Sequence, residues 1–217
     1  MEPLKLAILI PAHNEAGTIF RVAQQAARYG DVFVVDDGST DGTGDKARRA
    51  KARVIRSDNA GSYDRALDVG FKYIINGGEA YLGILTLDAD GQHPTDAIPF
   101  FVECLMRGDD LVLGERPQGA RVAEKLFGLY TSLRFGVSDP LCGMKAYSFS
   151  FAKERGHFDC RNSIGTELLM FGLSQKKRHS VVPIVVSPRV DRPRFGSFWK
   201  ANVRILAALV GSWSSGV

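Results

Sequence analysis

Two aspartates separated by one residue, Asp88 and Asp90, are the side chains of this 217-residue chain best placed for chemistry. They follow an apolar run, residues 84–87, that predicts a buried strand, and Gly91 then predicts a loop. Side chains two residues apart in a strand point to the same side, so we expect the carboxylates of Asp88 and Asp90 to face one cation. Gln92, two residues further on, is expected to face the same cation. Such hard oxygen ligands favour Mg²⁺ or Mn²⁺ carrying a phosphate. Asp-x-Asp-Gly is also common in ordinary turns, so the motif alone leaves both interpretations open.

Two more acidic loops follow predicted strands upstream. Glu15 lies after the apolar run of residues 6–10, and Asp36 and Asp37 lie after the run of residues 32–35. The carboxyl ends of parallel strands meet at one edge of a sheet, where open α/β sheets bind their ligands. Three acidic loops at one edge therefore favour a site for a nucleoside diphosphate whose charge is offset by a cation.

Strands and helices alternate in the first half, which predicts a mostly parallel, Rossmann-like α/β sheet with right-handed crossovers and helices on both faces. The expected strands are residues 6–10, 32–35, 53–56, 81–87, 110–113 and 181–186, with another after the loop of residues 139–145. The expected helices include residues 15–29, 62–75, 96–106, 122–135 and 166–173. Asn14 is expected to cap the first helix. No repeat or linker divides the chain, so we expect one domain, residues 1–217.

The composition is that of an ordinary globular protein, with 45% apolar and 24% charged residues. A net charge of +4 gives no indication of a nucleic-acid partner. The three cysteines form no C-x-x-C pair, which favours a reducing compartment. We find no signal peptide and no apolar run of the roughly 18 to 20 residues that span a bilayer. We therefore expect a cytoplasmic protein.

Three segments resemble the family 2 inverting glycosyltransferases of the GT-A fold. They are Pro11-Ala12-His13-Asn14-Glu15, the Val-Val-Asp-Asp-Gly-Ser-Thr-Asp-Gly-Thr segment of residues 34–43, and the Asp-Ala-Asp-Gly-Gln-His-Pro segment of residues 88–94. The chain is most similar to the dolichol-phosphate or polyprenol-phosphate mannosyltransferase branch. The resemblance implies a single GT-A domain in which residues 1–115 bind nucleotide sugar and metal, and residues 116–217 bind the acceptor.

The resemblance also implies individual roles. The nucleotide sugar would be bound by Pro11, Ala12, His13, Glu15, Asp36, Asp37, Gly38 and Asp88, and a Mg²⁺ or Mn²⁺ ion by Asp88, Asp90 and Gln92. The catalytic residues would be Asp90, Asp139 and Arg116, and the acceptor phosphate would be bound by Arg121, Arg192, Arg194 and Ser197.

Two segments depart from the family pattern. Residues 139–145 resemble the acceptor-side Asp-x-x-x-Gly-Phe-Arg segment, but Met144 and Lys145 replace Phe and Arg. Many relatives carry Gly-Lys-Gly where this chain has Gly61-Ser62-Tyr63, so we expect Arg65 to supply the missing cation. Cys142 is expected to be a packed small residue rather than a nucleophile, because no histidine lies beside it in the sequence.

The expected activity is metal-dependent, inverting transfer of a hexose from a nucleoside diphosphate sugar to a polyprenyl or dolichyl phosphate. GDP-mannose is the first choice of donor and UDP-glucose the second. A sugar hydroxyl acceptor, with Asp139 as its general base, stays open, as does a non-catalytic nucleotide-sugar binding module. A phosphatase of the haloacid dehalogenase type would carry Asp-x-Asp-Gly after its first strand, and a nucleotidyltransferase would carry a glycine-rich loop there; neither pattern is present.

A last amphipathic helix is expected near the C-terminus. Its apolar stripe contains Trp199, Val203, Leu206, Val210 and Trp213. Aromatic ends and basic flanks fit peripheral attachment to the cytoplasmic face of a membrane. Packing of the stripe on the protein's own core, or on a second copy, is the alternative.

Overall fold

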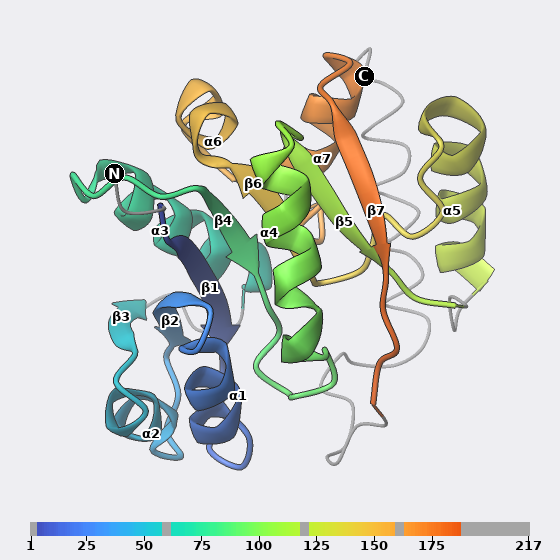
Figure 1. Ribbon diagram of the computed structural model, residues 1–217. Coiled ribbons are helices and arrows are strands. Elements are labelled where there is room, and N and C mark those ends of the chain that lie inside the picture. The colour runs from blue at the N-terminus through green and yellow to red at the C-terminus, as the bar shows by residue number, and fades with distance from the viewer. Residues whose placement is uncertain (1–3, 58–61, 118–121, 159–162, 188–217) are drawn as a thin grey trace.

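A seven-stranded mixed sheet with the order β3-β2-β1-β4-β6-β5-β7 forms the centre of the protein (Figure 1). The computed structural model describes residues 4–57, 62–117, 122–158 and 163–187. The strands are β1 (Leu6–Ala12), β2 (Gly30–Asp37), β3 (Arg53–Ser57), β4 (Gly83–Thr86), β5 (Leu111–Glu115), β6 (Lys145–Ser148) and β7 (His179–Pro183). Only β6 runs antiparallel to its neighbours, β4 and β5. The predicted mostly parallel α/β sheet is confirmed.

Helices cover both faces of this sheet (Figure 1). On one face lie α1 (Ile19–Ala26), α2 (Thr43–Arg49) and α4 (Ile98–Met106), the last preceded by a short 3₁₀ turn, Thr95–Ala97. On the other lie α3 (Tyr63–Asn76), α5 (Val122–Phe135), α6 (Phe149–Arg155) and α7 (Glu167–Ser174). Alternate residues of β1 supply the two cores: Ile8 and Ile10 face the α1 side, whereas Ala7 and Leu9 face the α3 side. The fully buried central strand explains the continuous apolar run in the sequence.

The prediction that Asn14 caps a helix beginning at Glu15 is wrong. Helix α1 begins at Ile19, and Thr18 is its N-cap residue. Asn14 instead has a left-handed backbone, with φ of 51°, and its side-chain oxygen accepts a hydrogen bond from the amide of Thr40, 2.9 Å away. Its side chain therefore links the loops after β1 and β2, and a turn separates it from the helix.

The predicted strand of residues 81–87 is shorter in the structure. Strand β4 ends at Thr86, so Asp88 and Asp90 lie in the following turn. The prediction that the two-residue alternation of a strand places both carboxylates is therefore wrong. The turn itself, with Gly91 at φ of 75°, determines their positions.

Within the residues that the structure describes, no helix has the length and apolar character needed to cross a membrane.

Candidate functional site

The loops after β1 and β2 are bonded to each other across the edge of the sheet. The amide of Asn14 donates to Ser39 Oγ, 2.9 Å away, and the amide of Glu15 donates to Thr43 Oγ1, 2.8 Å away. The His13 ring lies 2.6 Å from the carbonyl oxygen of Asp37. These contacts bring the first two predicted motif segments together, as the parallel sheet requires.

Asp36 and Asp37, at the end of β2, are both buried and hydrogen-bonded. Asp36 accepts a bond from the Ser39 amide, and Asp37 accepts one from the Ser62 amide, both at 3.0 Å. A Cβ atom at Gly44 would collide with the Asp36 carboxylate, so the glycine makes room for it. Asp37 thus attaches the N-terminus of α3 to this edge through a residue 25 positions away in the sequence.

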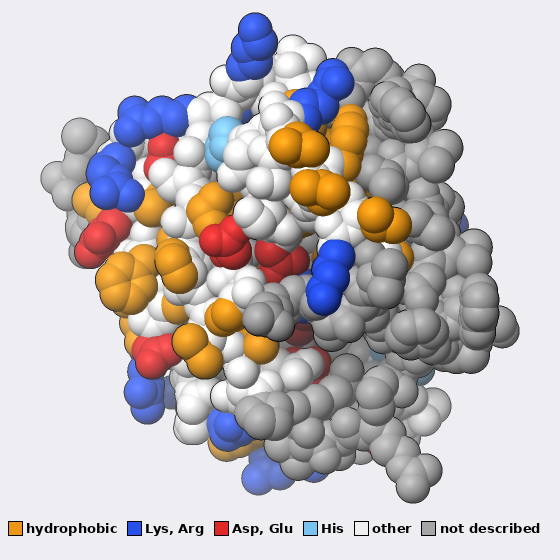
Figure 2. All heavy atoms as spheres, turned by 90° about the vertical axis from the view of Figure 1, so that its right-hand side faces the viewer, with side chains coloured by type: hydrophobic (Ala, Val, Ile, Leu, Met, Phe, Trp, Pro, Cys, Tyr) orange, Lys and Arg blue, Asp and Glu red, His pale blue; other side chains and the backbone are white. Residues whose placement is uncertain are grey.

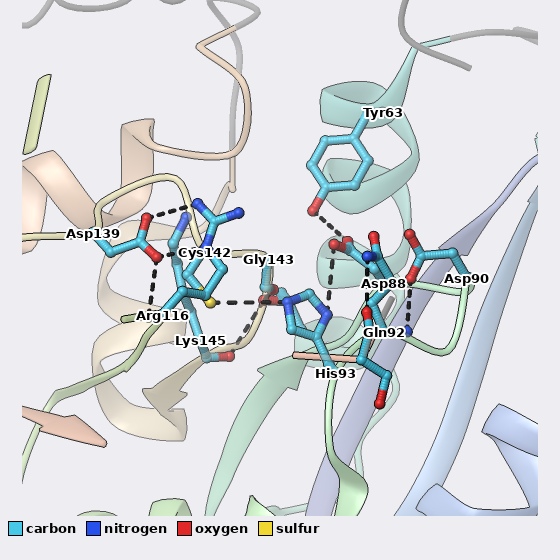
Figure 3. Close-up of polar contacts among 12 residues, drawn as sticks. Tyr63, Asp88, Asp90, Gln92, His93, Arg116, Asp139, Cys142, Gly143 and Lys145 are labelled. Atoms are coloured by element: carbon cyan, nitrogen blue, oxygen red, sulfur yellow. Dashed lines mark hydrogen bonds and ion pairs between the residues drawn. The ribbon is translucent and has the colours of Figure 1, made fainter. Parts of the chain in front are cut away.

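Asp88 is enclosed by His93 of its own loop and by residues from two other parts of the chain (Figure 3). Tyr63 donates its hydroxyl hydrogen to Asp88 Oδ1 at 3.0 Å, and His93 Nδ1 lies 3.6 Å from Oδ2. A Cβ atom at Gly143 would collide with the carboxylate, so only glycine leaves it this space. Burial of Tyr63, together with the charge of Asp88, holds the pKa of Tyr63 well above its usual value, so the phenol remains a donor.

Asp90 and Gln92 are oriented by the turn that contains them. Asp90 Oδ1 accepts the Gln92 amide hydrogen at 3.0 Å. The Gln92 side-chain Nε2 donates to the carbonyl of Ser187 at 3.1 Å, and the Ser187 amide donates back to the Gln92 carbonyl at 2.9 Å. The described chain after β7 therefore ends beside this turn.

The donor set fits a hard divalent cation. Asp88, Asp90 and the Gln92 side-chain carbonyl offer the oxygen atoms that such a cation prefers, and the space left by Gly143 accommodates the Asp88 carboxylate. No group of three or more His, Cys, Asp or Glu residues in the described segments could by itself hold a metal ion. Two carboxylates and an amide leave coordination positions for phosphate oxygens, which suits Mg²⁺ or Mn²⁺ carrying a diphosphate.

Arg116 and Asp139 form an ion pair beside the end of β5. The guanidinium donates from Nε to Oδ2 at 2.6 Å and from a terminal nitrogen to Oδ1 at 2.8 Å, while Glu124 lies 3.7 Å from it. The Asp139 hydrogen bonds raise the pKa of Arg116 further, so this side chain stays cationic. The structure brings these two predicted residues together, and both carboxylate oxygens of Asp139 face Arg116.

Cys142 lies next to a histidine in space, although none neighbours it in sequence. Its sulfur is 3.8 Å from His93 Nε2, and the other nitrogen of His93 faces Asp88. This Cys-His-Asp order resembles that of a nucleophilic triad. Burial, however, raises the pKa of the Cys142 thiol to about 12, which keeps it protonated. The thiol therefore packs between Arg116 and His93 (Figure 3), and the predicted packed, non-nucleophilic role of Cys142 agrees with its complete burial. The histidine beside it is 49 positions away in the sequence, so the sequence pattern could not show it.

Lys145, which replaces the usual arginine of the family, points into the protein. Its ammonium donates to the carbonyl of Gly165 at 3.0 Å, and burial lowers its pKa. Arg65, expected to supply a cation to the ligand, is an exposed residue of α3. The Tyr63–Asp88 and Lys145–Gly165 contacts were not predicted, because the partners are 25 and 20 positions apart in the sequence.

Several predicted residues lie outside the described residues: Arg121, Arg192, Arg194, Ser197 and the expected C-terminal helix.

Several known proteins with related sequences are named as mannosyltransferases that act on polyprenyl or dolichyl phosphates. The chain is 28% identical over 205 residues to the dolichol-phosphate mannosyltransferase of Pyrococcus furiosus, covering 83% of this chain and 55% of that protein. It is 29% identical over 165 residues to the undecaprenyl-phosphate mannosyltransferase of Micrococcus luteus, covering 66% of each. This chain therefore spans between about half and two thirds of the length of these relatives.

Solved structures share the fold. Glucosyl-3-phosphoglycerate synthase from Mycobacterium tuberculosis, solved with Mn²⁺ and UDP-glucose, superposes with a TM-score of 0.77 at 20% identity. The superposition covers 96% of this chain and 79% of that one. The predicted GT-A fold is thus confirmed.

The family model described as Glycosyl transferase family 2 matches residues 7–155, which contain all three motif segments and the Arg116–Asp139 pair. The predicted resemblance is confirmed: this chain belongs to glycosyl transferase family 2.

Proposed function

We propose that this protein is a metal-dependent, inverting glycosyltransferase that moves a hexose from a nucleoside diphosphate sugar to a polyprenyl phosphate. One observation carries the proposal: the loop of residues 139–143 joins the two halves of the site. At its start Asp139 holds Arg116, and at its end Gly143 lies against the carboxylate of Asp88. One short loop thus contacts both a cationic group, Arg116, and a proposed metal-ligating carboxylate, Asp88, which suits a reaction between two phosphate-bearing substrates.

The donor would lie along the β1, β2 and β4 edge. The residues proposed to bind it are Pro11, Ala12, His13, Glu15, Asp36, Asp37 and Gly38, and Asp88, Asp90 and Gln92 would hold Mg²⁺ or Mn²⁺. When bound, the cation offsets the negative charge of the diphosphate. GDP-mannose is the first candidate because the named relatives are mannosyltransferases. UDP-glucose is the second, because a solved structure of the same fold binds it.

In the proposed reaction an oxygen of the acceptor phosphate attacks the anomeric carbon from the face opposite the diphosphate. The new carbon–oxygen bond forms as the bond to the diphosphate breaks, and the nucleoside diphosphate leaves with the electron pair, which inverts the anomeric centre. The acceptor is already anionic, so no strong base is needed. Asp139 would therefore orient Arg116, whose charge stabilises the diphosphate as it leaves.

The acceptor would enter from the side of α5. Arg121, Arg192, Arg194 and Ser197 are proposed to bind its phosphate, because arginine grips phosphate through paired donors. Figure 2 shows hydrophobic side chains gathered on the face that includes α5, where Leu126, Leu129 and Leu133 are exposed. Together with the apolar stripe expected at residues 198–213, this face would place the protein on a membrane surface, where a polyprenyl tail resides.

The direct test is turnover of radiolabelled GDP-mannose and UDP-glucose with a short polyprenyl phosphate and Mn²⁺. We expect label in a chloroform-soluble product with one donor, and none in excess EDTA. Label on a water-soluble sugar acceptor would instead support the hydroxyl-acceptor alternative. If donors raise the thermal stability but no label moves, the protein is a nucleotide-sugar binding module.

A further inference from the structure

Tyr63, the first residue of α3, contacts a proposed metal ligand from outside the Asp-x-Asp-Gly-Gln segment. Its hydroxyl donates to Asp88 Oδ1 at 3.0 Å, and the ring points from α3 toward residues 88–92, called here the metal turn (Figure 3). His93 lies near the other carboxylate oxygen, 3.6 Å from Oδ2. Asp88 therefore has a neighbour at each oxygen, and the Tyr63 bond is the shorter contact.

The Tyr63 ring packs against the backbone of Gly165, and hydrogen bonds hold this glycine in place. A Cβ atom at Gly165 would lie 3.2 Å from Cε1 of the ring, so the Gly165 backbone passes directly beside it. The Gly165 amide donates to the buried carboxylate of Asp64 at 2.6 Å, and its carbonyl accepts from Lys145 at 3.0 Å. Both hydrogen-bonding groups of this glycine are thus held, one by α3 and one by β6.

This arrangement connects two of the residues that the sequence singles out, Tyr63 and Lys145. Lys145 donates from its ammonium to the carbonyl of Gly165, and the Gly165 backbone lies against the Tyr63 ring. Both residues contribute to one continuous support: Lys145 bonds to Gly165, Gly165 lies against Tyr63, and Tyr63 bonds to Asp88. A ligating carboxylate supported by a hydrogen bond from outside the metal site keeps one orientation and loses less freedom when the ion binds.

We propose that Tyr63 is a positioning residue that fixes the orientation of the Asp88 carboxylate for a divalent cation. Gly165, hydrogen-bonded to Lys145 and Asp64, holds the Tyr63 ring in place. The inference rests on the proposed function, since it needs Asp88 to be a metal ligand. Loss of such an outer hydrogen bond typically lowers metal affinity by about 10- to 100-fold. Tyr63 acts through Asp88 and has no contact with the reacting atoms in this proposal.

The test is Mn²⁺ binding to the intact protein, measured from the electron paramagnetic resonance signal of free Mn²⁺. Tyr63→Phe removes only the hydroxyl, and we expect its Mn²⁺ dissociation constant to rise by about tenfold or more. Tyr81→Phe is the matched control, because the Tyr81 hydroxyl also bonds to carboxylates, those of Asp31 and Glu79, in a contact outside the metal turn. Its affinity for Mn²⁺ should equal that of the unmodified protein.

Activity gives a second readout that separates positioning from general destabilisation. The Tyr63→Phe enzyme should need about tenfold more Mn²⁺ for half-maximal turnover, yet approach normal turnover at saturating Mn²⁺. Unchanged Mn²⁺ affinity in Tyr63→Phe, with affinity lost in Asp88→Asn, would overturn this inference and leave the metal site in place. If the unmodified protein binds no Mn²⁺, with or without UDP or GDP, the proposed metal dependence and the role of Tyr63 both fall.

Discussion

Arg116 and Asp139 are joined at two points, with nitrogen–oxygen distances of 2.6 and 2.8 Å, and the backbone amide of Arg116 adds a third bond at 3.2 Å. The pair connects the end of β5 to the loop that precedes β6. A guanidinium held in this way has one orientation before any phosphate arrives, so it loses little freedom on binding.

Replacing Asp139 by Asn should weaken both stability and turnover. The amide cannot neutralise Arg116, whose side chain is 24% exposed, against 10% for Asp139. The free energy of unfolding should fall by about 2 kcal/mol, between the values for exposed and fully buried pairs. Turnover should fall by about tenfold or more because the guanidinium loses its orientation. Urea unfolding and steady-state rates measure the two effects. Asp45→Asn, which breaks the exposed pair with Arg48, should change neither.

Replacing Asp90 by Asn should cut turnover by more than about a hundredfold, the loss expected when one strong electrostatic stabiliser is removed. Asp90 accepts the Gln92 amide, a bond that the Asn oxygen can keep, so the turn should stay intact. Turnover with Mn²⁺ and labelled donor is the measurement. Asp96→Asn is the control, because Asp96 is exposed in the turn that follows. Full activity of the unmodified enzyme in excess EDTA would contradict metal dependence.

Replacing Gly143 by Ala should disable the metal site without unfolding the protein. The added methyl would collide with the Asp88 carboxylate and displace it, whereas the buried sheet around it needs no change. Mn²⁺ affinity should fall by about tenfold or more, as for other disturbed metal ligands. Calorimetric titration with Mn²⁺, together with a thermal melt, tests this. Gly77→Ala, at the end of α3, should bind Mn²⁺ normally; equal losses in both variants would indicate a general effect on folding.

Cys142 should resist alkylation in the folded protein. Burial raises its pKa to about 12, so at pH 8 almost no thiolate is present to react. Iodoacetamide labelling followed by peptide mass spectrometry should find Cys142 unmodified in buffer and modified in guanidinium chloride. Rapid labelling of the folded protein would show that the thiol is accessible and reactive.

The same raised pKa makes stability depend on pH above the ordinary thiol value of 9.0. The folded state binds the thiol proton more tightly than the unfolded chain does. The contribution of the protonated Cys142 thiol to the free energy of unfolding is therefore fully present below about pH 9 and is lost as the pH rises toward 12. A Cys142→Ala variant should lose less stability over that interval in urea titrations, and equal slopes for the two proteins would contradict this account.

The exposed leucines of α5 should contribute to membrane attachment. Leu129 and Leu133 are 57% and 82% exposed, and burial in a lipid interface would remove apolar area from water. A Leu129→Gln, Leu133→Gln double variant should float less with anionic liposomes at low salt. Phe100→Gln is the control, since Phe100 is similarly exposed but lies on α4, on the opposite face of the sheet. If the unmodified protein does not float under these conditions, the membrane proposal is wrong.

The local patterns of the sequence determined the fold class and the edge of the site. Apolar runs such as residues 6–10 and 32–35 predict buried strands because a central parallel strand is covered on both faces. Alternation of strands and helices then places the acidic segments containing Glu15, Asp36 and Asp37 at one edge. These features depend on neighbours along the chain, and the structure reproduces them.

Only the tertiary structure decided which side chains meet. The Tyr63–Asp88 bond spans 25 positions, the Cys142–His93 contact 49, and the Arg116–Asp139 pair 23. The Cys142–His93 and Arg116–Asp139 contacts depend on the insertion of antiparallel β6 between β4 and β5. The Tyr63–Asp88 bond depends on the packing of α3 beside the loop after β4. Hydrophobic periodicity indicates that a strand is buried, but it does not indicate which strand lies beside it in the sheet. The sequence therefore specified the chemistry at the edge of the sheet, while the packing of distant loops set the geometry around Asp88.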